Sequence, residues 1–465
     1  MCGIFGIEGS EDAANLTYLG LYALQHRGQE STGIVSWDGD RLNVQRGMGK
    51  VAEIFKERRS LGRLPGDRAI GHVRYSTHGK SVIHNAQPIV VKTSMGPLGV
   101  IHNGNLVNAN QLRLRLEAEG SIFQTTSDTE VILHLMARKP HDDIVESLME
   151  ALIEVEGAYS LLLVTEQGLI AARDPHGFRP LVLGEYQGRA CFASESCAFD
   201  LMEGALVREV ERGEVIIATG DEIRSYRLPG EKTGALCPFE HVYFARPDSQ
   251  IFGDSVSRAR HEMGAQLARE APAVADLVVP VPDGGVIGAL GYSRESGLPF
   301  EMGLIRNHYV GRTFIEPQQS IRDFGVRVKL NPVRSMIKDR KIVLVDDSIV
   351  RGTTSQKIVR MMRRAGASEV HLRITCPPWR WPCRYGISTP TREELIGSSN
   401  DVQQIREYVG ADSLAFLSTE GLLGCLTGER ASYCTACWDG QYPVQPSRHD
   451  VDQTQLFPIQ MDDHE

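Results

Sequence analysis

The sequence lacks the features that place a chain in a membrane or direct it to secretion. No apolar run approaches the ~18 residues that a membrane-spanning helix needs. The residues after Met1 do not form a basic region followed by an apolar stretch, as a signal peptide would. Hydrophobic residues make up 42% of the 465 residues, which is enough to bury substantial cores. We therefore expect a cytoplasmic globular protein of roughly two to three domains.

The chain also lacks an excess of positive charge. Its formal charge of −9 argues against a general nucleic-acid binder, which would normally present a basic face. It does not exclude a small anionic substrate, because a local basic loop or a bound metal ion can reverse the field at one site. The nine cysteines are an odd number spread along the chain, so metal binding or catalysis is a better expectation than a disulfide framework.

Residues before about 235 have the pattern of antiparallel sheets with helices packed on them. The segments SLLLVTEQGLIAARD, LVLGEYQGRACFA and EVIIATGDEIRSY are typical of hairpins, since each has a glycine near its turn. NLTYLGLYALQ carries apolar residues at helical spacing and ends at HRGQ. This half is predicted to be an α+β domain.

From about residue 250 the pattern changes. DLVVPVPD, PFEMGLI, RKIVLVDD and EVHLRIT are short continuous apolar runs, typical of buried parallel strands. Helical segments lie between them, including TSQKIVRMMRRAG, in which Ile358, Met361 and Met362 share a face. Strands that alternate with helices predict an open α/β sheet. The expected division is an α+β domain over 2–235, an α/β domain over 236–440 and a C-terminal tail over 441–465.

The segment KIVLVDDSIVRGTTSQKI has the pattern of a phosphate-binding loop. A buried strand is predicted over 342–345, with Asp346 and Asp347 at its carboxyl end, where ligands of open α/β sheets bind. Backbone N–H groups and threonine hydroxyls at a helix start form an anion site, and two adjacent carboxylates suit ribose hydroxyls and a phosphate-bound Mg²⁺. An acidic turn after a strand is common on its own, but the Thr353-Thr354 loop makes the whole segment more specific.

This segment resembles the ribose-phosphate loop of type I phosphoribosyltransferases, which bind phosphoribosyl pyrophosphate (PRPP) with Mg²⁺. VPVPDGGVIGALGY occupies the place of that family's pyrophosphate loop, and RNHYVGRTFIEPQQSIRDFGVRVKLNPVR resembles the lid that closes over PRPP and excludes water. The resemblance implies that Asp346 and Asp347 bind Mg²⁺. It implies a PRPP site made of Asp283, Arg306, Arg312, Asp346, Asp347, Ser348, Val350, Arg351, Gly352, Thr353 and Thr354.

Five motifs in the first half, CGIFGI, ALQHRGQES, GHVRYSTHG, IHNGNLVN and TTSDTE, together resemble class II glutamine amidotransferases, whose N-terminal domain has the Ntn-hydrolase fold. In that family the initiator methionine is removed, and the new N-terminal cysteine, here Cys2, attacks the side-chain amide of glutamine. An α-amine has a pKa near ~8, so it can act as the base for the thiol beside it. An isolated Asn-Gly is more often a turn, but five motifs in the family's order indicate the family.

The same resemblance implies a role for each matching residue. Arg74 would hold the α-carboxylate of glutamine, and Asp128 would pair with its α-ammonium group. Asn103 and the N–H of Gly104 would form the oxyanion hole. The remaining pocket residues would be Arg27, Gly28 and Thr77.

The combination of these two halves resembles the enzymes that transfer the amide nitrogen of glutamine to PRPP. It implies that Cys2 releases ammonia, which travels internally to the PRPP site and forms 5-phosphoribosylamine, the first committed step of purine synthesis. The family also suggests a homotetramer inhibited by purine nucleotides. Two alternatives are another class II amidotransferase, such as a glucosamine-phosphate synthase or an asparagine synthetase, and a PRPP-sensing regulator. The first alternative needs a sugar-isomerase half or a Ser-Gly-Gly-x-Asp-Ser loop, and the sequence has neither.

Four of the remaining cysteines can supply a metal site. Cys434 and Cys437 form a Cys-x-x-Cys pair, and Cys237 and Cys383 stand alone. Four thiolates suit either Zn²⁺ or a [4Fe–4S] cluster, and spacing does not decide between them. The resemblance implies the cluster, because these positions match its ligands in the iron–sulfur branch of the family. That cluster would be structural, since the reaction transfers no electrons.

Three positions depart from the family's usual pattern. The pyrophosphate loop normally has Ser or Thr after Pro-Asp, with its hydroxyl near Mg²⁺, and here the residue is Gly284. The segment before the lid usually reads Lys-Asn-Arg-Tyr, and here it carries Arg306 and His308. Arginine in place of lysine keeps the charge but changes its geometry, and histidine is only partly charged at neutral pH. A rewired but working PRPP site is the expected result, and weaker PRPP binding or a changed pH dependence is the alternative.

Overall fold

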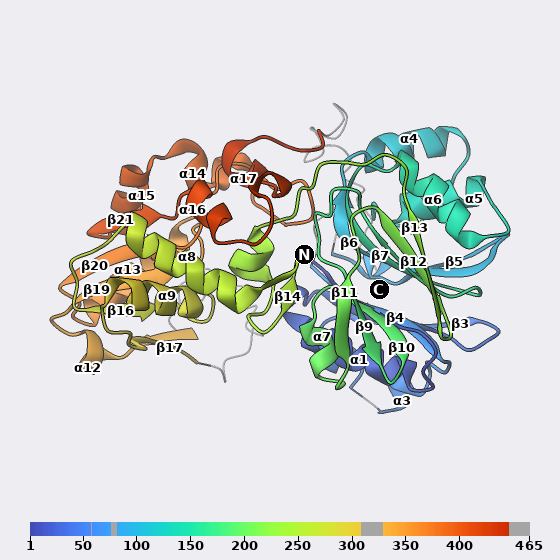
Figure 1. The fold of residues 1–465 in the computed structure, drawn as a ribbon, viewed down its shortest axis with the longest axis horizontal. Helices are drawn as coiled ribbons and strands as arrows, with labels where there is room; N and C mark the ends of the chain where they lie inside the picture. Colours follow the sequence, from blue (N-terminus) through green and yellow to red (C-terminus); the bar gives the residue numbers. More distant parts are fainter. Residues whose placement is uncertain (57, 76–80, 308–328, 446–465) are drawn as a thin grey trace, which may run out of the picture. The chain divides into compact units, whose positions relative to one another are not determined.

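The computed structural model describes the chain except for residues 57, 76–80, 308–328 and 446–465 (Figure 1). The chain forms two compact units. The first contains Met1–Leu236, Cys383–Ser388 and the segment that begins at Tyr442, and the second contains Cys237–Pro382 and Thr389–Gln441. Most of the predicted tail, and most of the predicted lid including His308 and Arg312, lie outside the described residues. None of the described helices is long and apolar enough to cross a membrane.

Two antiparallel sheets form the centre of the first unit (Figure 1). The strands of the first sheet are, in spatial order, β11 (Ala205–Glu209), β9 (Val182–Tyr186), β10 (Arg189–Ala193), β1 (Gly3–Ile7), β4 (Arg68–Arg74), β2 (Ser31–Trp37) and β3 (Leu42–Met48). Those of the second are β13 (Glu222–Arg227), β12 (Glu214–Thr219), β8 (Leu169–Arg173), β7 (Gly157–Thr165), β6 (Gly96–Leu106) and β5 (Ile89–Thr93). The hairpins β7–β8, β9–β10 and β12–β13 confirm the three predicted from the sequence.

The two sheets pack face to face with helices outside them, which gives four layers. Residues of both sheets, including Ile4 and Ile101, share the core between the sheets. The outer face of the first sheet is covered by α1 (Ala13–Ala23) and α7 (Cys197–Asp200), and near it lie the short α2 (Val51–Ile54) and α3 (Arg58–Leu61). The outer face of the second sheet is covered by α4 (Ala109–Ala118), α5 (Glu130–Arg138) and α6 (Ile144–Glu154). This arrangement confirms the α+β class.

A four-stranded parallel sheet organises the second unit, which confirms the α/β class. Its strands are β16 (Leu277–Pro280), β19 (Lys341–Asp346), β20 (Glu369–Ile374) and β21 (Ser413–Phe416). The longer helices are α8 (Val256–Glu270), α9 (Val286–Ser296), α13 (Thr353–Arg364) and α15 (Val402–Val409). On α13, Ile358 and Met362 are buried, while Met361, which was predicted to share their face, is partly exposed.

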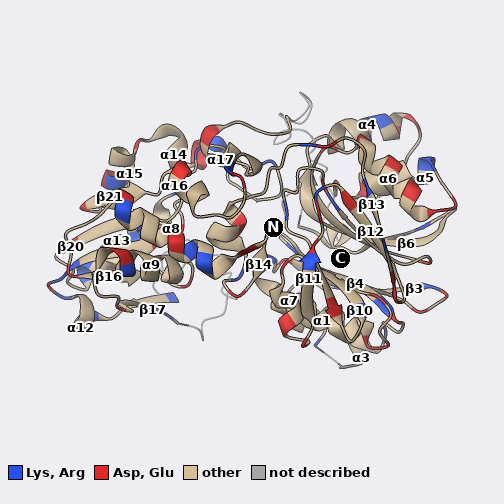
Figure 2. Ribbon diagram, in the orientation of Figure 1, with Lys and Arg blue, Asp and Glu red and all other residues tan. Residues whose placement is uncertain are grey.

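Several short elements complete the second unit. They are η3 (Glu240–Phe244), β14 (Gln250–Ile251), β15 (Asp254–Ser255), α12 (Arg334–Ile337), η4 (Arg392–Glu394), α14 (Ile396–Ser399), α16 (Thr419–Gly424), η5 (Arg430–Ser432) and α17 (Ala436–Asp439). Figure 2 shows that acidic and basic residues occur on the same helices, as on α8.

The prediction of a buried parallel strand at PFEMGLI is wrong. This segment supplies β17 (Leu304–Arg306), which pairs antiparallel with β18 (Leu330–Pro332) in a separate two-stranded sheet. Only Phe300 makes a single parallel bridge, to Val278 beside the main sheet. Residues 301–303, between this bridge and β17, form no strand. Gly303 packs so closely that a Cβ there would come within 3.0 Å of side-chain atoms of Val279 and Ile337.

Candidate active sites

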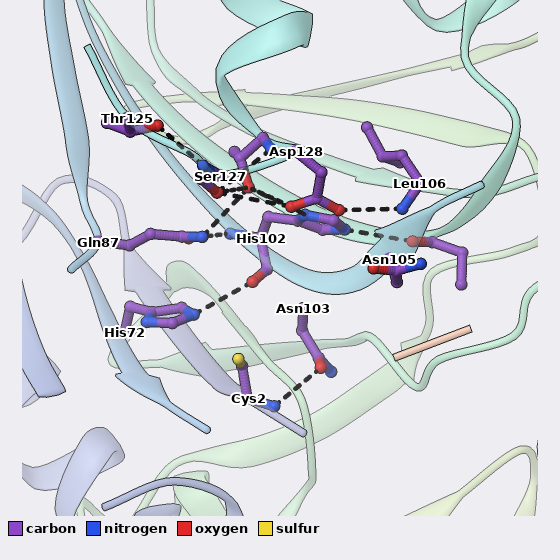
Figure 3. Close-up of polar contacts among 12 residues, drawn as sticks. Cys2, His72, Gln87, His102, Asn103, Asn105, Leu106, Thr125, Ser127 and Asp128 are labelled. Atoms are coloured by element: carbon purple, nitrogen blue, oxygen red, sulfur yellow. Dashed lines mark hydrogen bonds and ion pairs between the residues drawn. The ribbon is translucent and has the colours of Figure 1, made fainter. Parts of the chain in front are cut away.

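The main chain of Cys2 is held at both of its polar groups, just before β1 begins. Its nitrogen lies 3.2 Å from Asn103 Oδ1 on β6, and its carbonyl oxygen accepts a hydrogen bond of 2.9 Å from Arg27 Nε (Figure 3). The thiol lies 3.7 Å from the carbonyl oxygen of Tyr75. Cys2 is only 7% exposed. Cys2, whose thiol is a strong nucleophile when deprotonated, therefore has its main chain held in one orientation at the edge of a buried site.

Asn103 has the features of an oxyanion-hole residue. Its Oδ1 faces the nitrogen of Cys2, while its Nδ2 is a buried donor that has no hydrogen-bond partner among the described residues. A buried donor without an acceptor costs free energy, and a ligand oxygen would satisfy it. Gly104 follows on the same strand, where a Cβ would overlap the carbonyl oxygen of Ala158. Glycine is therefore required at 104 by the packing of β6 against β7.

The other predicted glutamine-site residues lie on neighbouring elements. Arg74 ends β4 and is buried, and Gly28 packs so closely on the backbone of Arg74 that a Cβ at 28 would come within 2.8 Å of three of its atoms. Arg27 lies in the short 3₁₀ helix η1 (Gln25–Arg27), and it contacts the main chain of Cys2. Thr77 lies outside the described residues.

Asp128 belongs to a buried polar network on the opposite face of β6 from Asn103 (Figure 3). Alternate residues of a strand face opposite sides, and Val100 lies in the core beneath the helices while Ile101 lies between the sheets. His102 therefore points toward α5, where its Nδ1 lies 3.1 Å from Thr129 Oγ1 and 3.8 Å from Asp128 Oδ1. The other carboxylate oxygen of Asp128 accepts a hydrogen bond of 2.9 Å from the N–H of Leu106.

The charges of the two buried histidines differ. Burial lowers the pKa of His72 to about 3, so this side chain is neutral and donates from Nε2 to the carbonyl oxygen of His102, at 3.1 Å. Burial also opposes the charged form of His102, but Asp128 and the carbonyl oxygen of Ala158 outweigh it and raise the pKa of His102 above its usual value. The carboxylate of Asp128 therefore favours the charged form of His102.

In the second unit, the predicted PRPP loop runs from the end of β19 to the start of α13. Asp346 ends the strand, and Asp347 is buried and accepts a hydrogen bond of 2.7 Å from Ser348 Oγ. Gly352 caps α13 with a positive φ of 75°, a conformation that glycine adopts without strain. The loop and helix start bring together the predicted residues Asp346, Asp347, Ser348, Val350, Arg351, Gly352, Thr353 and Thr354. Thr353 and Thr354 are exposed in the first turn of the helix.

The two adjacent carboxyl groups are poorly solvated. Burial and the neighbouring Asp347 raise the pKa of Asp346, and burial raises the pKa of Asp347 to about 6. Two carboxylates that resist ionisation side by side would be stabilised by a divalent cation, and oxygen ligands suit Mg²⁺. The donor set at this strand end therefore fits Mg²⁺. Among the described residues, no group of three or more Cys, His, Asp or Glu side chains is placed to hold a metal ion.

The pyrophosphate-loop segment lies beside these carboxylates. Asp283 forms an ion pair with Arg306 of β17, so two of the predicted PRPP residues contact each other. A Cβ built on Gly284 would overlap Asp347 Oδ2. The carboxylate of Asp347 thus takes the space that a side chain at 284 would need, so only glycine fits there without a shift of Asp347.

The four cysteines proposed as metal ligands divide between the units. Cys237, Cys434 and Cys437 belong to the second unit, and Cys383 belongs to the first. The thiol sulfur of Cys383 lies 3.3 Å from the N–H of Tyr385 and 3.8 Å from Arg179 Nη2. Donors of this kind stabilise a thiolate or a metal-bound sulfur.

Two buried residues of the glutamine site were not predicted. His102 directly precedes Asn103 in IHNGN, so its motif was recognised but its own role was not. Glu195 contacts Arg27 from 168 positions away in the sequence, and nothing in ASESCAF marks it.

We predict that His102→Asn will loosen the strand that carries Asn103. Because the pKa of His102 is raised in the folded chain, its stabilising charge is present below the ordinary pKa near ~6.5 and is lost as the pH rises through the raised value. The variant should therefore lose more amide protection in 96–106 at pH 6 than at pH 9, by about 1–3 kcal/mol at pH 6. Hydrogen–deuterium exchange of parent and variant at each pH measures this.

His141→Asn, which changes a half-exposed histidine of the same unit, serves as the control and should leave 96–106 unchanged. Equal loss of protection in His102→Asn at both pH values would contradict a contribution from the charge of His102.

We predict that Gly284→Ser will weaken Mg²⁺-dependent PRPP binding about tenfold, because overpacking costs about 1–3 kcal/mol and 1.4 kcal/mol is a factor of ten. The new Cβ would force Asp347 away from Ser348. Gly284→Ala carries the same Cβ without the hydroxyl and should be equally impaired in equilibrium PRPP binding. Tighter binding by the serine variant would show instead that a hydroxyl at 284 acts as a ligand.

Comparison with protein families supports both halves of this description. The model described as a glutamine amidotransferase domain matches residues 72–200, and the model described as a phosphoribosyl transferase domain matches residues 256–383. Amidophosphoribosyltransferase 2 of Arabidopsis thaliana, a chloroplastic protein, is 52% identical over 452 residues, which cover 97% of this chain and 80% of the relative. The amidophosphoribosyltransferase of Bacillus subtilis is 47% identical over 449 residues, covering 96% of this chain and 94% of the relative.

Solved structures agree with the sequence relatives. The glutamine PRPP amidotransferase of B. subtilis, complexed with ADP and GMP, superposes with a TM-score of 0.91 at 47% identity and covers 96% of this chain and 98% of that one. A structure described as the allosteric regulatory enzyme of purine biosynthesis gives a TM-score of 0.92 at 47% identity, covering 97% of this chain and 98% of that one. Identity near half over nearly the whole length of both chains leaves one conclusion: the chain belongs to the amidophosphoribosyltransferase family.

Proposed function

We propose that this protein converts PRPP, glutamine and water into 5-phospho-β-D-ribosylamine, glutamate and pyrophosphate, the first committed step of purine synthesis. The observation that carries the proposal is the arrangement around Cys2, whose nitrogen and carbonyl oxygen are both held while Asn103 Nδ2 offers an unsatisfied buried donor. The second unit of the same chain supplies a carboxylate pair at a strand end that fits a Mg²⁺-bound phosphoribosyl substrate.

In the glutamine half-reaction, residue 1 is removed and the nitrogen of Cys2 becomes an α-amine. This amine takes the thiol proton, and the sulfur attacks the amide carbon of glutamine. Asn103 Nδ2 and the N–H of Gly104 stabilise the oxyanion. The proton then passes to the departing nitrogen, ammonia leaves, and water hydrolyses the thioester to glutamate. Arg74 and Asp128 hold the α-carboxylate and the α-ammonium group.

In the PRPP half-reaction, ammonia displaces pyrophosphate from C1 of the ribose. Asp346 and Asp347 would hold Mg²⁺, which neutralises the charge that develops on the leaving pyrophosphate. The exposed hydroxyls of Thr353 and Thr354 at the start of α13 bind the 5-phosphate. Arg306, which pairs with Asp283, and Arg312 would bind the pyrophosphate.

Two further features follow the family. The B. subtilis neighbour is complexed with ADP and GMP, and another neighbour is described as an allosteric regulatory enzyme, which supports purine nucleotides as inhibitors of this chain. We also propose a homotetramer that works in the cytoplasm. A PRPP-sensing regulator without catalysis is the second candidate, since Gly284, Arg306 and His308 depart from the family's usual pattern.

The decisive experiment measures pyrophosphate release with PRPP and either glutamine or ammonia as the nitrogen source. The parent protein should use both. Cys2→Ala should lose at least about 10³-fold with glutamine, because it removes the nucleophile, and should keep its rate with ammonia. Protein that hydrolyses glutamine but never consumes PRPP would refute the proposed reaction, and Mg²⁺-dependent PRPP binding without turnover would support the sensor.

We further propose that Cys237, Cys383, Cys434 and Cys437 bind a structural [4Fe–4S] cluster, with Zn²⁺ as the alternative. The N–H of Tyr385 and the guanidinium of Arg179 at the sulfur of Cys383 support a metal-bound thiolate. Anaerobically purified protein should contain about four iron atoms per chain and absorb broadly near ~400 nm. Cys434→Ser should abolish both signals and Cys425→Ser neither. Stoichiometric zinc without iron would decide for the alternative.

A further inference from the structure

A buried ion pair contacts the main chain of Cys2 through Arg27. Arg27 and Glu195 have fully buried side chains, and Arg27 Nη1 donates to Glu195 Oε1. The same oxygen lies 2.8 Å from His26 Nε2. The other oxygen of the carboxylate lies 3.6 Å from the thiol of Cys197. Glu195 is therefore approached by donors on both of its oxygens.

The sheet brings Glu195 to this position. Strand β10 runs antiparallel to β1, with Ala193 opposite Phe5. The N–H of Ser194 donates to the carbonyl oxygen of Ile4 at 3.0 Å, and the N–H of Ile4 donates to Ser194 Oγ at 3.0 Å. The residue after Ser194 consequently lies beside the first residues of β1. Glu195 is thus held beside the strand that begins directly after Cys2.

Arg27 links the carboxylate to the nucleophile. Its Nε donates to the carbonyl oxygen of Cys2 at 2.9 Å while its Nη1 donates to Glu195. A guanidinium group is planar, so holding one edge of it sets the direction of the other donors. The buried negative charge of Glu195 also offsets the cost of burying the cation of Arg27.

From this geometry we infer that Glu195 is a positioning residue for glutamine hydrolysis, which acts by holding Arg27 against the carbonyl group of Cys2. This inference rests on the proposed role of Cys2 as the nucleophile. In this role Glu195 acts through Arg27 and sets the orientation in which the thiol meets the amide carbon.

The test is Glu195→Gln, which keeps the shape of the side chain and removes its charge. We expect kcat for glutamine to fall about 10- to 100-fold, as small misplacements of reacting groups do. The KM for glutamine should stay within twofold, because Arg74 and Asp128 are unchanged. The alkylation rate of Cys2 by a diazoketone analogue of glutamine should fall in the same proportion, with its binding constant unchanged. Ammonia-dependent turnover should be unaffected.

The matched control is Glu8→Gln. Glu8 forms another buried ion pair of the same unit, with Arg68 Nη2 at 2.7 Å, at the end of β1 away from Cys2. It should lower thermal stability to a similar extent and leave kcat for glutamine within twofold. Equal kcat values for Glu195→Gln and Glu8→Gln would overturn the inference, because the effect would then be only structural.

Two further variants keep the outcome decisive. If Glu195→Gln loses the amide protection of β1, Glu195→Asp replaces it, since the shorter side chain keeps the charge but withdraws it from Arg27. A parent-like kcat in this variant would also overturn the inference. Cys2→Ser is measured in parallel, and full glutamine turnover by that variant would refute the proposed nucleophile itself rather than the role of Glu195.

Discussion

Two hydrogen bonds on the main chain of Cys2 are the constraint on which the first unit depends. One partner, Asn103, belongs to the second sheet, and the other, Arg27, follows α1 on the first sheet. Cys2 can satisfy both only while the two sheets stay packed through the core that contains Ile4 and Ile101. Close packing of apolar side chains between the sheets thereby fixes the distance between Cys2 and the donor Nδ2 of Asn103.

In the second unit, the main constraint is the concentration of negative charge at one strand end. Asp346 and Asp347 are costly to ionise together, and the raised pKa of each records that cost. A parallel sheet places this cost beside the exposed first turn of α13, where a phosphate is favoured. The ionised carboxylate pair thus destabilises the strand end at which Mg²⁺ and a phosphate group are proposed to bind.

Much of this could be predicted from the sequence, because the relevant signals are local. Neighbouring residues determine the hairpins that have a glycine at the turn. They also determine the strand that ends at Asp346 and the helix that starts at Thr353. The antiparallel β17 was missed because its partner is supplied across a long intervening segment. The contact of Glu195 with Arg27 and the close approach of Asp347 to Gly284 were not predicted for the same reason. Each joins distant positions whose residue types carry no signal alone.

The pleat of β6 has a consequence for substrate choice. Under the proposed mechanism, consecutive residues of this strand would serve opposite ends of glutamine. His102 faces Asp128, the proposed partner of the α-ammonium group, and Asn103 faces the nitrogen of Cys2. Because the ladder with β7 is continuous from Leu98 to Leu106, the separation between these two ends cannot adjust. The strand would therefore restrict the length of the substrate that can reach both ends. Asparagine, one methylene shorter, would reach only one end, and such a difference is worth about 1–3 kcal/mol of discrimination.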